Sequence, residues 1–284
     1  MKFSVLIVNY ASWPLTLRCV ESLRATGYGS FEIIVVDNDS LEPPELPSGV
    51  QMIRNKENLG FARAHNRGIA SSTGELVVLI NPDTAVERDF FERLEEFFGE
   101  NPHAGVAGPR IMDSEGELQL SARREINPLS GLLGRTSLLT RLFPESSLVK
   151  SQFPAVTSQS HPTPVDWVSG ACMVVRRRTL LDTGPLDERF FMYFEDADLC
   201  RRAREAGHPV FYLPGVEVIH QTGGSSRSKP RAIWLLHKSA FLYHRKHGPH
   251  GPLNLYSAAV LLGLAARALV KLAAAEKDRI LKPS

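Results

Sequence analysis

The sequence predicts an α/β protein with a mostly parallel central sheet flanked by helices. Short aliphatic and β-branched runs alternate with helical patterns between residues 3 and 108, which is typical of a parallel sheet covered by helices. Polar residues follow most of the expected strands. The chain has 284 residues, of which 43% are hydrophobic, so it is long enough to bury a substantial core.

Five apolar runs are expected to form strands in the first part of the chain. They are Phe3–Val8, Phe31–Val36, Gln51–Arg54, Leu76–Ile80 and Gly105–Gly108. Three helical patterns lie between them, over Pro14 to Arg24, Phe61 to Ser71 and Arg88 to Phe98. The third places a row of Phe and Leu side chains on one helical face. The predicted order is therefore β-α-β-β-α-β-α-β.

The second half contains a long irregular segment, from Gln119 to Pro164, that is rich in Ser, Pro and Thr. We expect this segment to cross the surface as a long excursion, and long loops of this kind are often functional. Regular structure is expected again beyond it. The expected elements are a strand over Trp167–Val175, a helix from about Asp196 to Ala206, and short strands over Val210–Leu213 and Glu217–Ile219.

We interpret residues 1–224 as one globular domain and residues 225–284 as a basic, amphipathic helical tail. In the tail, Leu255 to Leu281 has a helical pattern with leucines and alanines on one side and Arg267 and Lys271 on another. Two interpretations stay open for this helix. It packs on its own domain or a second subunit, or it lies on a membrane surface.

Composition and charge exclude several classes of protein. The 33 Lys and Arg residues nearly balance 31 acidic residues, so nucleic acid is not an expected partner. The 3 cysteines form no CxxC pair, which argues against a disulfide framework or structural zinc and favours the cytoplasm. The apolar runs at the N-terminus and at Ala258–Ala266 are too short for a signal peptide or a membrane span. We expect a cytoplasmic protein that is at most peripheral at the inner face of the cytoplasmic membrane.

Polar residues follow four of the expected strands. They are Asn9-Tyr10, Asp37-Asn38-Asp39-Ser40, Asn55-Lys56-Glu57-Asn58 and Asn81-Pro82-Asp83. Each alone is a plausible turn, but ligands of open α/β sheets bind beyond the carboxyl ends of the strands, so together they predict a site. The sequence has neither the glycine-rich dinucleotide motif nor a P-loop. A phosphate-bearing ligand would then need another anchor, such as Mg²⁺ or Mn²⁺ held by Asp83.

With further motifs along the chain, these residues resemble the family 2 glycosyltransferases with the GT-A fold, especially the rhamnosyltransferase-like members that build bacterial cell-surface polysaccharides. The matching blocks follow the family's order across most of the chain. They are Val8-Asn9-Tyr10, Val35 to Ser40, Asn58 to Ala62, Asn66-Arg67-Gly68, Leu79 to Asp83, Trp167 to Ala171, Phe191 to Leu199, and His220. The resemblance implies a GT-A, Rossmann-like fold for residues 1–224 and inverting transfer of a hexose from a nucleotide diphosphate.

Carried onto this sequence, the resemblance implies that Asp37 contacts the nucleobase, Asp83 binds the metal, Asp196 is the catalytic base and His220 completes the metal site. A carboxylate at Asp37 can accept the N3–H of uracil or thymine, which favours dTDP or UDP donors. The family's metal motif is more often Asp-x-Asp. Here Asn81 stands at its first position, which removes one charge but leaves a group that can hydrogen-bond the ribose or the donor sugar.

Glu195 is the second candidate catalytic carboxylate, and Asp198, on the same helical face as Glu195, competes for the role. The remaining candidates for binding the nucleotide sugar are Asn9, Tyr10, Asn38, Asn58, Gly60, Arg63 and Asn66. Trp167 and Gly170 are expected to shape the acceptor or donor-sugar pocket. The alternative for each is a structural role, such as capping a turn or filling the core.

The preferred function is transfer of a hexose, with L-rhamnose from dTDP-rhamnose as the candidate donor, to a saccharide or lipid-linked saccharide. A lipid-linked acceptor would explain the amphipathic tail. A catalytically silent nucleotide-sugar-binding scaffold is one alternative. A sugar nucleotidylyltransferase is another, but it is disfavoured because the segment after the first strand is not the glycine-rich, basic loop that a triphosphate needs.

Overall fold

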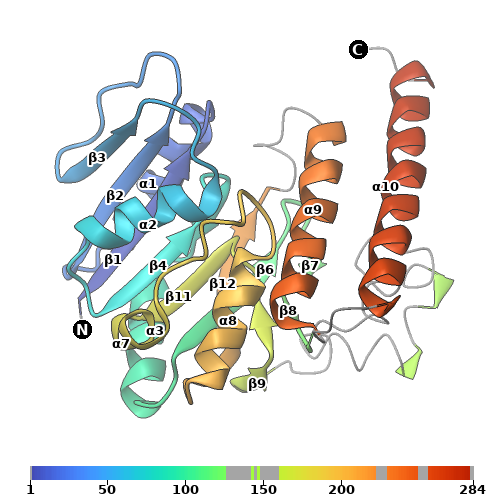
Figure 1. The fold of residues 1–284 in the computed structure, drawn as a ribbon. Helices are drawn as coiled ribbons and strands as arrows, with labels where there is room; N and C mark the ends of the chain where they lie inside the picture. Colours follow the sequence, from blue (N-terminus) through green and yellow to red (C-terminus); the bar gives the residue numbers. More distant parts are fainter. Residues whose placement is uncertain are drawn as a thin grey trace.

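The computed structural model describes residues 2–125, 142–143, 146–147, 160–221, 229–248 and 255–281. Ten strands of these residues form one mixed sheet, whose main path has the order β3-β2-β1-β4-β11-β6-β12-β5. Helices cover both faces of the sheet, and two further helices stand beside it (Figure 1). The predicted α/β class, with a mostly parallel sheet flanked by helices, is confirmed.

The N-terminal half follows the sequence prediction closely. Strands β1 (Phe3–Asn9), β2 (Phe31–Asn38), β3 (Val50–Asn55) and β4 (Leu76–Ile80) are parallel, and their order places β1 between β2 and β4. Helices α1 (Trp13–Ala25) and α2 (Phe61–Ser71) connect them. All seven residues of β1 and all five of β4 are buried, as expected for strands with both faces covered.

The C-terminal half of the sheet contains both strand directions. After β5 (Thr84–Val86) and α3 (Phe90–Glu100), β6 (Val106–Met112) enters the sheet, and β11 (Cys172–Arg176) inserts antiparallel between β4 and β6. The expected strands over Val210–Leu213 and Glu217–Ile219 are one strand, β12 (Val210–His220), with an irregularity between Leu213 and Glu217. Short helix α7 (Arg177–Thr183) and α8 (Glu195–Glu205) lie between β11 and β12.

The prediction of a single strand over Trp167–Val175 is wrong. Residues 167–168 form β10 (Trp167–Val168), which pairs with β8 (Ala122–Arg123), whereas β11 belongs to the main sheet. The break at residues 169–171 coincides with a change of partner: β10 pairs with β8 and Gly170 N donates to Asp196, whereas Ala171 O accepts from Asn81 N in register with the pairing of β11 and β4.

Both ends of the expected surface excursion are held by strands. Its start contributes β7 (Leu118–Gln119), which pairs with β6, and β8, while its end contributes β9 (Thr163–Val165), which pairs with β12. Residues 126–141, 144–145 and 148–159 lie outside the described residues. The excursion therefore begins and ends on the sheet.

Alternate strand residues feed two hydrophobic clusters, one on each face of the sheet. One cluster joins Phe3, Val5 and Ile7 of β1 to α1 and α3. The other joins Leu6 and Val8 to α2 and α8. Successive side chains of a strand point to opposite faces of the sheet, so one strand contributes to the core on both sides.

A third, smaller cluster attaches the C-terminal helices. Helix α9 (Lys229–His247) packs against α8 and the segment before it through Phe190, Ala197 and Tyr243. Helix α10 (Leu255–Leu281) lies alongside α9, on the side away from the sheet (Figure 1). None of the helices in the described part of the chain combines the length and hydropathy needed to cross a bilayer.

Candidate active site

The predicted polar residues meet at the carboxyl edge of the parallel strands. Asn9 ends β1 and Asp37 lies beside it in the register of β1 with β2. Asn81 follows β4, while His220 ends β12 and is paired with Thr84 of β5. Pairing of β5 with β12 thus brings His220 next to the turn that carries Asp83.

Asp37 is fully buried and its two carboxylate oxygens differ. Oδ1 accepts hydrogen bonds from Asn9 Nδ2 (3.1 Å) and Ser40 N (3.3 Å). Oδ2 has no hydrogen-bond partner among the described residues, and Arg54 Nε lies 3.6 Å from it. The carboxylate is therefore fixed by one oxygen and presents the other as an acceptor.

A pocket of about 330 Å³ opens between the segments that follow β1 and β2. It is lined by Tyr10, Ala11, Trp13, Pro14, Asp39 and Leu41. Ala11 (φ 50°) and Asp39 (φ 71°) both adopt left-handed backbone, which is uncommon for such residues and often marks functional sites. Tyr10 is 41% exposed, so its ring is available to a planar ligand.

Most of the predicted asparagines use their amides within the chain. Asn9 donates to Asp37 and Ser40 and accepts from Ser12 and Thr16. Asn38 bonds Asn55, Asn58, Leu59 and Gly60, and Asn66 bonds the backbone of Leu186 in both directions. These contacts indicate that the asparagines position the loops of the site. Their direct contact with a donor stays a prediction.

Gly60 and Arg63 also face the segment before α8. Gly60 has φ 81°, and a Cβ there would lie 2.5 Å from the carbonyl oxygen of Phe191, so only glycine fits this close approach. Arg63 is exposed and its Nε lies 3.6 Å from Glu188 Oε2. Its predicted contact with a diphosphate stays a prediction.

Asp83 and His220 form the candidate metal pair. Asp83 is buried, and its Oδ1 lies 3.2 Å from His220 Nε2 without a hydrogen bond in the described part of the structure. Asn81 Nδ2 lies 3.4 Å from the same ring nitrogen. No three His, Cys, Asp or Glu side chains within the described ranges converge on a point that could hold a metal ion. Among the described residues, Asp83 and His220 are thus the two candidate metal ligands at this point.

Gln119 is a site residue that sequence reasoning missed. Its Nε2 donates to the carbonyl of His220 (2.8 Å), which leaves its Oε1 to accept from His220 Nδ1 (3.0 Å). This contact fixes the proton on Nδ1 and leaves the lone pair of Nε2 directed at Asp83. Gln119 stands at the start of the irregular segment, and only the β6–β7 pairing brings it here.

The two candidate catalytic carboxylates begin α8. Tyr193 (φ 71°) and Phe194 (φ 69°) are both left-handed, so the chain reverses sharply before the helix. Asp196 Oδ2 accepts from Gly170 N (2.9 Å) and Oδ1 from Ala197 N (2.8 Å). Loss of hydration raises the pKa of Asp196, against the opposing effect of these hydrogen bonds and of Arg123.

Glu195 is more deeply buried than its neighbour. Its Oε2 has no hydrogen-bond partner among the described residues. Burial, the adjacent charge of Asp196 and that of Asp198 raise the pKa of Glu195 well above its ordinary value. Perturbed carboxyl pairs of this kind cluster at active sites.

Asp198, the competing carboxylate, is fully buried and is bonded to Arg202 (2.8 Å), Lys246 (2.6 Å) and His247 (2.7 Å). Its hydrogen bonds to His247 and Lys246 help lower its pKa against the effect of burial. Asp198 is therefore a structural anion and not a candidate base.

Trp167 and Gly170 flank the carboxylates. The indole of Trp167 donates to the carbonyl of Arg124 (3.1 Å), and the guanidinium of Arg123 lies 5.0 Å from its ring. Gly170 holds Asp196, while the next carbonyl, of Ala171, accepts from Asn81 N (2.9 Å). Gly170 and Ala171 thus connect Asp196 to the turn that carries Asp83.

The fold resembles solved enzymes that bind nucleotide sugars. Staphylococcus aureus TarS 1–349 in complex with UDP-GlcNAc aligns with a TM-score of 0.57 and 17% identity over 100% of this chain and 76% of that chain. The mannosyltransferase PcManGT of Pyrobaculum calidifontis, in complex with GDP-Man and Mn²⁺, aligns with a TM-score of 0.56 and 17% identity over 99% and 81%. The fold is that of the GT-A glycosyltransferases.

The profile of the family described as "Glycosyltransferase like family 2" matches residues 1–239. An N-acetylglucosaminyl-diphospho-decaprenol L-rhamnosyltransferase of Mycobacterium tuberculosis is 29% identical over 84% of this chain and 82% of its own length. The rhamnosyltransferase WbbL of Escherichia coli K12 is 25% identical over 84% and 91%. The chain belongs to glycosyltransferase family 2, and the protein is a glycosyltransferase with rhamnosyltransferase relatives.

Replacing Glu195 by Gln should raise the stability of the folded protein at pH 7. The folded-state pKa of Glu195 lies above its unfolded value, so the carboxyl favours folding when protonated and this contribution is lost as pH rises through the folded pKa. Thermal melts should show a Tm increase of about 2–4 °C per kcal/mol gained, which shrinks as the pH is lowered. Glu100→Gln, at an exposed position of α3, is the control, and an equal Tm change in both variants would contradict the prediction.

Proposed function

We propose that the protein is an inverting transferase that moves L-rhamnose from dTDP-L-rhamnose onto a saccharide carried by a prenyl diphosphate lipid, in cell-surface polysaccharide synthesis. One observation carries this proposal. Gly170 and Ala171 connect the base candidate Asp196 to the turn bearing Asp83. One segment therefore positions both the group proposed to deprotonate the acceptor hydroxyl and the group proposed to bind the metal at the donor diphosphate. The two rhamnosyltransferase relatives support the choice of sugar and acceptor.

Oδ2 of Asp37, which has an ion-pair contact with Arg54 but no hydrogen-bond partner among the described residues, supports recognition of thymine or uracil. It can accept the N3–H of either base, whereas N3 of cytosine carries no proton and would face the carboxylate with a lone pair. The adjoining pocket, with Tyr10 and Leu41 in its wall, offers apolar surface for a base. Asp37 does not separate thymine from uracil, and the relatives name the sugar but not the nucleotide, so dTDP is the part of the proposal that the donor screen below tests.

Asp83 and His220 fit a divalent cation of the Mg²⁺ or Mn²⁺ type. Two electron-pair donors lie 3.2 Å apart, and the proton on the imidazole is held away from them by Gln119. Mg²⁺ in phosphate-transfer sites is commonly bound by one or two protein ligands together with phosphates of the substrate, which suits a pair that lacks a third protein ligand. When bound, the ion would neutralise charge on the departing diphosphate. The solved relatives PcManGT and GalNAc-T7 contain Mn²⁺.

Asp196 is proposed as the general base. Its carboxylate takes the proton from an acceptor hydroxyl while that oxygen attacks the anomeric carbon, and the bond to the diphosphate oxygen breaks on the opposite face. This single displacement inverts the anomeric centre. A raised pKa makes Asp196 a stronger base than an ordinary Asp, and Glu195, with a still more raised pKa, would serve as a protonated hydrogen-bond donor beside it.

The outer face of α10 supports contact with a membrane. Every α10 residue described as exposed is apolar or glycine: Ala258, Leu261, Leu262, Gly263, Ala265, Ala266, Leu269 and Val270. Arg267 and Lys271 are half-buried and lower the pKa of His237 in α9, so they face the neighbouring helix. An apolar face directed outward fits the surface of a bilayer that carries the lipid-linked acceptor.

The two alternative functions have less support. A nucleotidylyltransferase would need a triphosphate-binding loop after β1, where the chain instead has the hydrogen-bonded turn of Asn9, Ser12 and Ser40. A silent scaffold would have no use for a buried carboxylate pair held behind the strained turn of Tyr193 and Phe194, since such strain clusters at functional sites.

Asp196→Asn should lower kcat by about 10²- to 10⁴-fold, because an amide cannot take the proton. Binding of dTDP-L-rhamnose should change little, and the measurement is release of dTDP together with calorimetric donor binding. Asp89→Asn, at the surface ion pair with Arg93, is the matched control and should keep its activity. Near-native turnover of Asp196→Asn with intact donor binding would remove the assignment of the base.

A thermal-shift screen with dTDP, UDP and CDP, with and without Mn²⁺, tests the donor site. A ligand that binds only the folded protein at about 100 times its Kd adds about 2.7 kcal/mol to the free energy of unfolding. We expect dTDP and UDP to raise Tm more than CDP, and Mn²⁺ to increase the shift.

Gln119→Leu in the same screen should weaken only the Mn²⁺ increment, by about 10- to 100-fold in apparent metal affinity, because the imidazole loses its fixed tautomer. Gln51→Leu, at an exposed position of the edge strand β3, is the control. Equal shifts with all three nucleotides would contradict the role of Asp37, and an unchanged Mn²⁺ increment in Gln119→Leu would contradict the metal pair.

Sedimentation with anionic vesicles tests the face of α10. The double variant Leu262→Glu/Leu269→Glu should lose most of its partition, since two charges replace leucines that are 71% and 68% exposed. Leu181→Glu, at a 74% exposed leucine of α7, should partition like the parent protein. Equal partition of all three proteins would remove the membrane contact from the proposal.

A further inference from the structure

We propose that Lys246 and His247, at the end of α9, are positioning residues for the reaction: they hold the base-bearing start of α8 through Asp198. The inference rests on Asp196 as the base of the proposed function. By this proposal, residues of helix α9 position the catalytic base of the active site. The argument follows from three sets of contacts around the first turn of α8.

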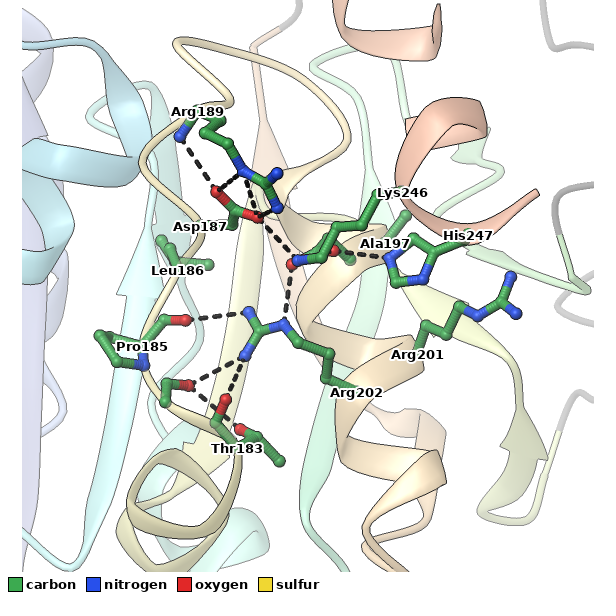
Figure 2. Close-up of polar contacts among 12 residues, drawn as sticks. Thr183, Pro185, Leu186, Asp187, Arg189, Ala197, Arg201, Arg202, Lys246 and His247 are labelled. Carbon is green, nitrogen blue, oxygen red and sulfur yellow. Dashed lines mark hydrogen bonds and ion pairs between the residues drawn. The ribbon is translucent and has the colours of Figure 1, made fainter. Parts of the chain in front are cut away.

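The first set is a buried ion cluster between α8 and α9. Asp198 lies two residues after Asp196 and is fully buried. Its Oδ1 receives Lys246 Nζ (2.6 Å) and His247 Nε2 (2.7 Å), and its Oδ2 receives Arg202 Nε (2.8 Å). Figure 2 shows Lys246 and His247 directed from α9 toward α8. Both oxygens of Asp198 are therefore held, one by α9 and one by its own helix.

The second set joins this cluster to the loop before α8. Lys246 Nζ also lies 2.7 Å from Asp187 Oδ2, which is paired with Arg189 (2.6 Å). The guanidinium of Arg202 donates to the carbonyls of Thr183 (2.8 Å), Gly184 (3.1 Å) and Pro185 (2.9 Å), and most of this network is visible in Figure 2. Lys246 thus bridges two carboxylates on either side of the strained turn.

The third set places α9 against the strained turn itself. Ser239 Oγ donates to the carbonyl of Met192 (2.8 Å), and the ring of Tyr243 lies 5.6 Å from that of Phe194. Two successive left-handed residues, Tyr193 and Phe194, are strained backbone positions, and such strain persists where the surroundings determine it. Helix α9 contacts both this turn and Asp198 in the first turn of α8. These contacts fix the orientation of the first turn of α8 and therefore of the Asp196 side chain.

The cluster also controls the charge around the base. Asp198 is one of the groups that raise the pKa of Glu195, and Asp196 is another. Arg202, Lys246 and His247 offset the charge of Asp198, and Arg123 faces Asp196. Loss of one cation leaves more of the negative charge of Asp198 uncompensated beside the carboxylate pair. If Lys246 only joined the two helices, its loss would not change the electrostatic environment of Asp196 and Glu195.

Lys246→Met tests the inference in the full-length protein, with dTDP-L-rhamnose as donor. We expect kcat to fall about tenfold, the donor KM to stay within about twofold, and the acidic limb of the kcat profile to move to higher pH, because uncompensated negative charge favours protonated carboxyls. Lys246→Arg keeps the charge and should restore the position of the limb. Lys238→Met, the same change at an exposed position of α9, is the matched control.

A double-mutant cycle covers the case in which Lys246→Met folds poorly. In an Asp198→Asn background the lysine has no buried charge to offset at this position, so adding Lys246→Met should change the acidic limb little further. The inference is overturned if folded Lys246→Met keeps parental kcat and pH profile, or if the limb moves equally with and without Asp198. Asp196→Asn, measured in parallel, separates the two ideas: high turnover in that variant defeats the proposed base, whereas an inactive Asp196→Asn beside a fully active Lys246→Met defeats only the positioning role.

Discussion

Two consecutive residues, Gly170 and Ala171, hold the two halves of this active site together. The amide of Gly170 donates to Asp196, and the carbonyl of Ala171 accepts from the amide of Asn81. Because β11 begins at the next residue and runs antiparallel between β4 and β6, the segment is anchored in the centre of the sheet. The start of α8, which carries Asp196, is therefore held in position by the same strands that position the candidate metal pair. Such fixed placement is what a reaction between two bound groups requires.

Three carboxylates in the first turn of α8 are handled in three different ways. The positive end of the helix dipole favours all of them. Asp198 is bonded to Arg202, Lys246 and His247, Asp196 accepts hydrogen bonds from two backbone amides, and Glu195 has an oxygen with no partner in the described structure. The pKa order follows, lowered for Asp198 and raised for the other two. The three carboxylates are thereby suited to different roles: Asp198 anchors the helix, and Asp196 and Glu195 are the candidate reactive groups.

The sequence predicted the parallel half of the sheet because each strand there is an apolar run bounded by turn residues, and this signal is local. It failed at Trp167–Val175, where Ser169 and Gly170 separate two residues that pair with β8 from five residues that pair in the main sheet. Gln119 was missed for a related reason. Nothing near it in the sequence indicates a partner, and its contact with His220 exists only because β7 and β12 both pair with β6. Motifs predicted which residues meet, whereas pairing between distant strands decides what each one touches.

The tail shows how composition can mislead about the direction of a charge. The sequence indicated a basic, amphipathic tail, but Lys246 and His247 contact Asp187 and Asp198 inside the protein. The exposed residues of α10 whose burial is described are apolar or glycine. Since His244 of α9 also bonds Ser257 of α10 (2.9 Å), the two helices form a continuous connection from this apolar face to the start of α8. A surface that receives α10 would thereby be held at a fixed distance from the carboxylates, which is a geometric requirement for an acceptor that enters from a lipid layer.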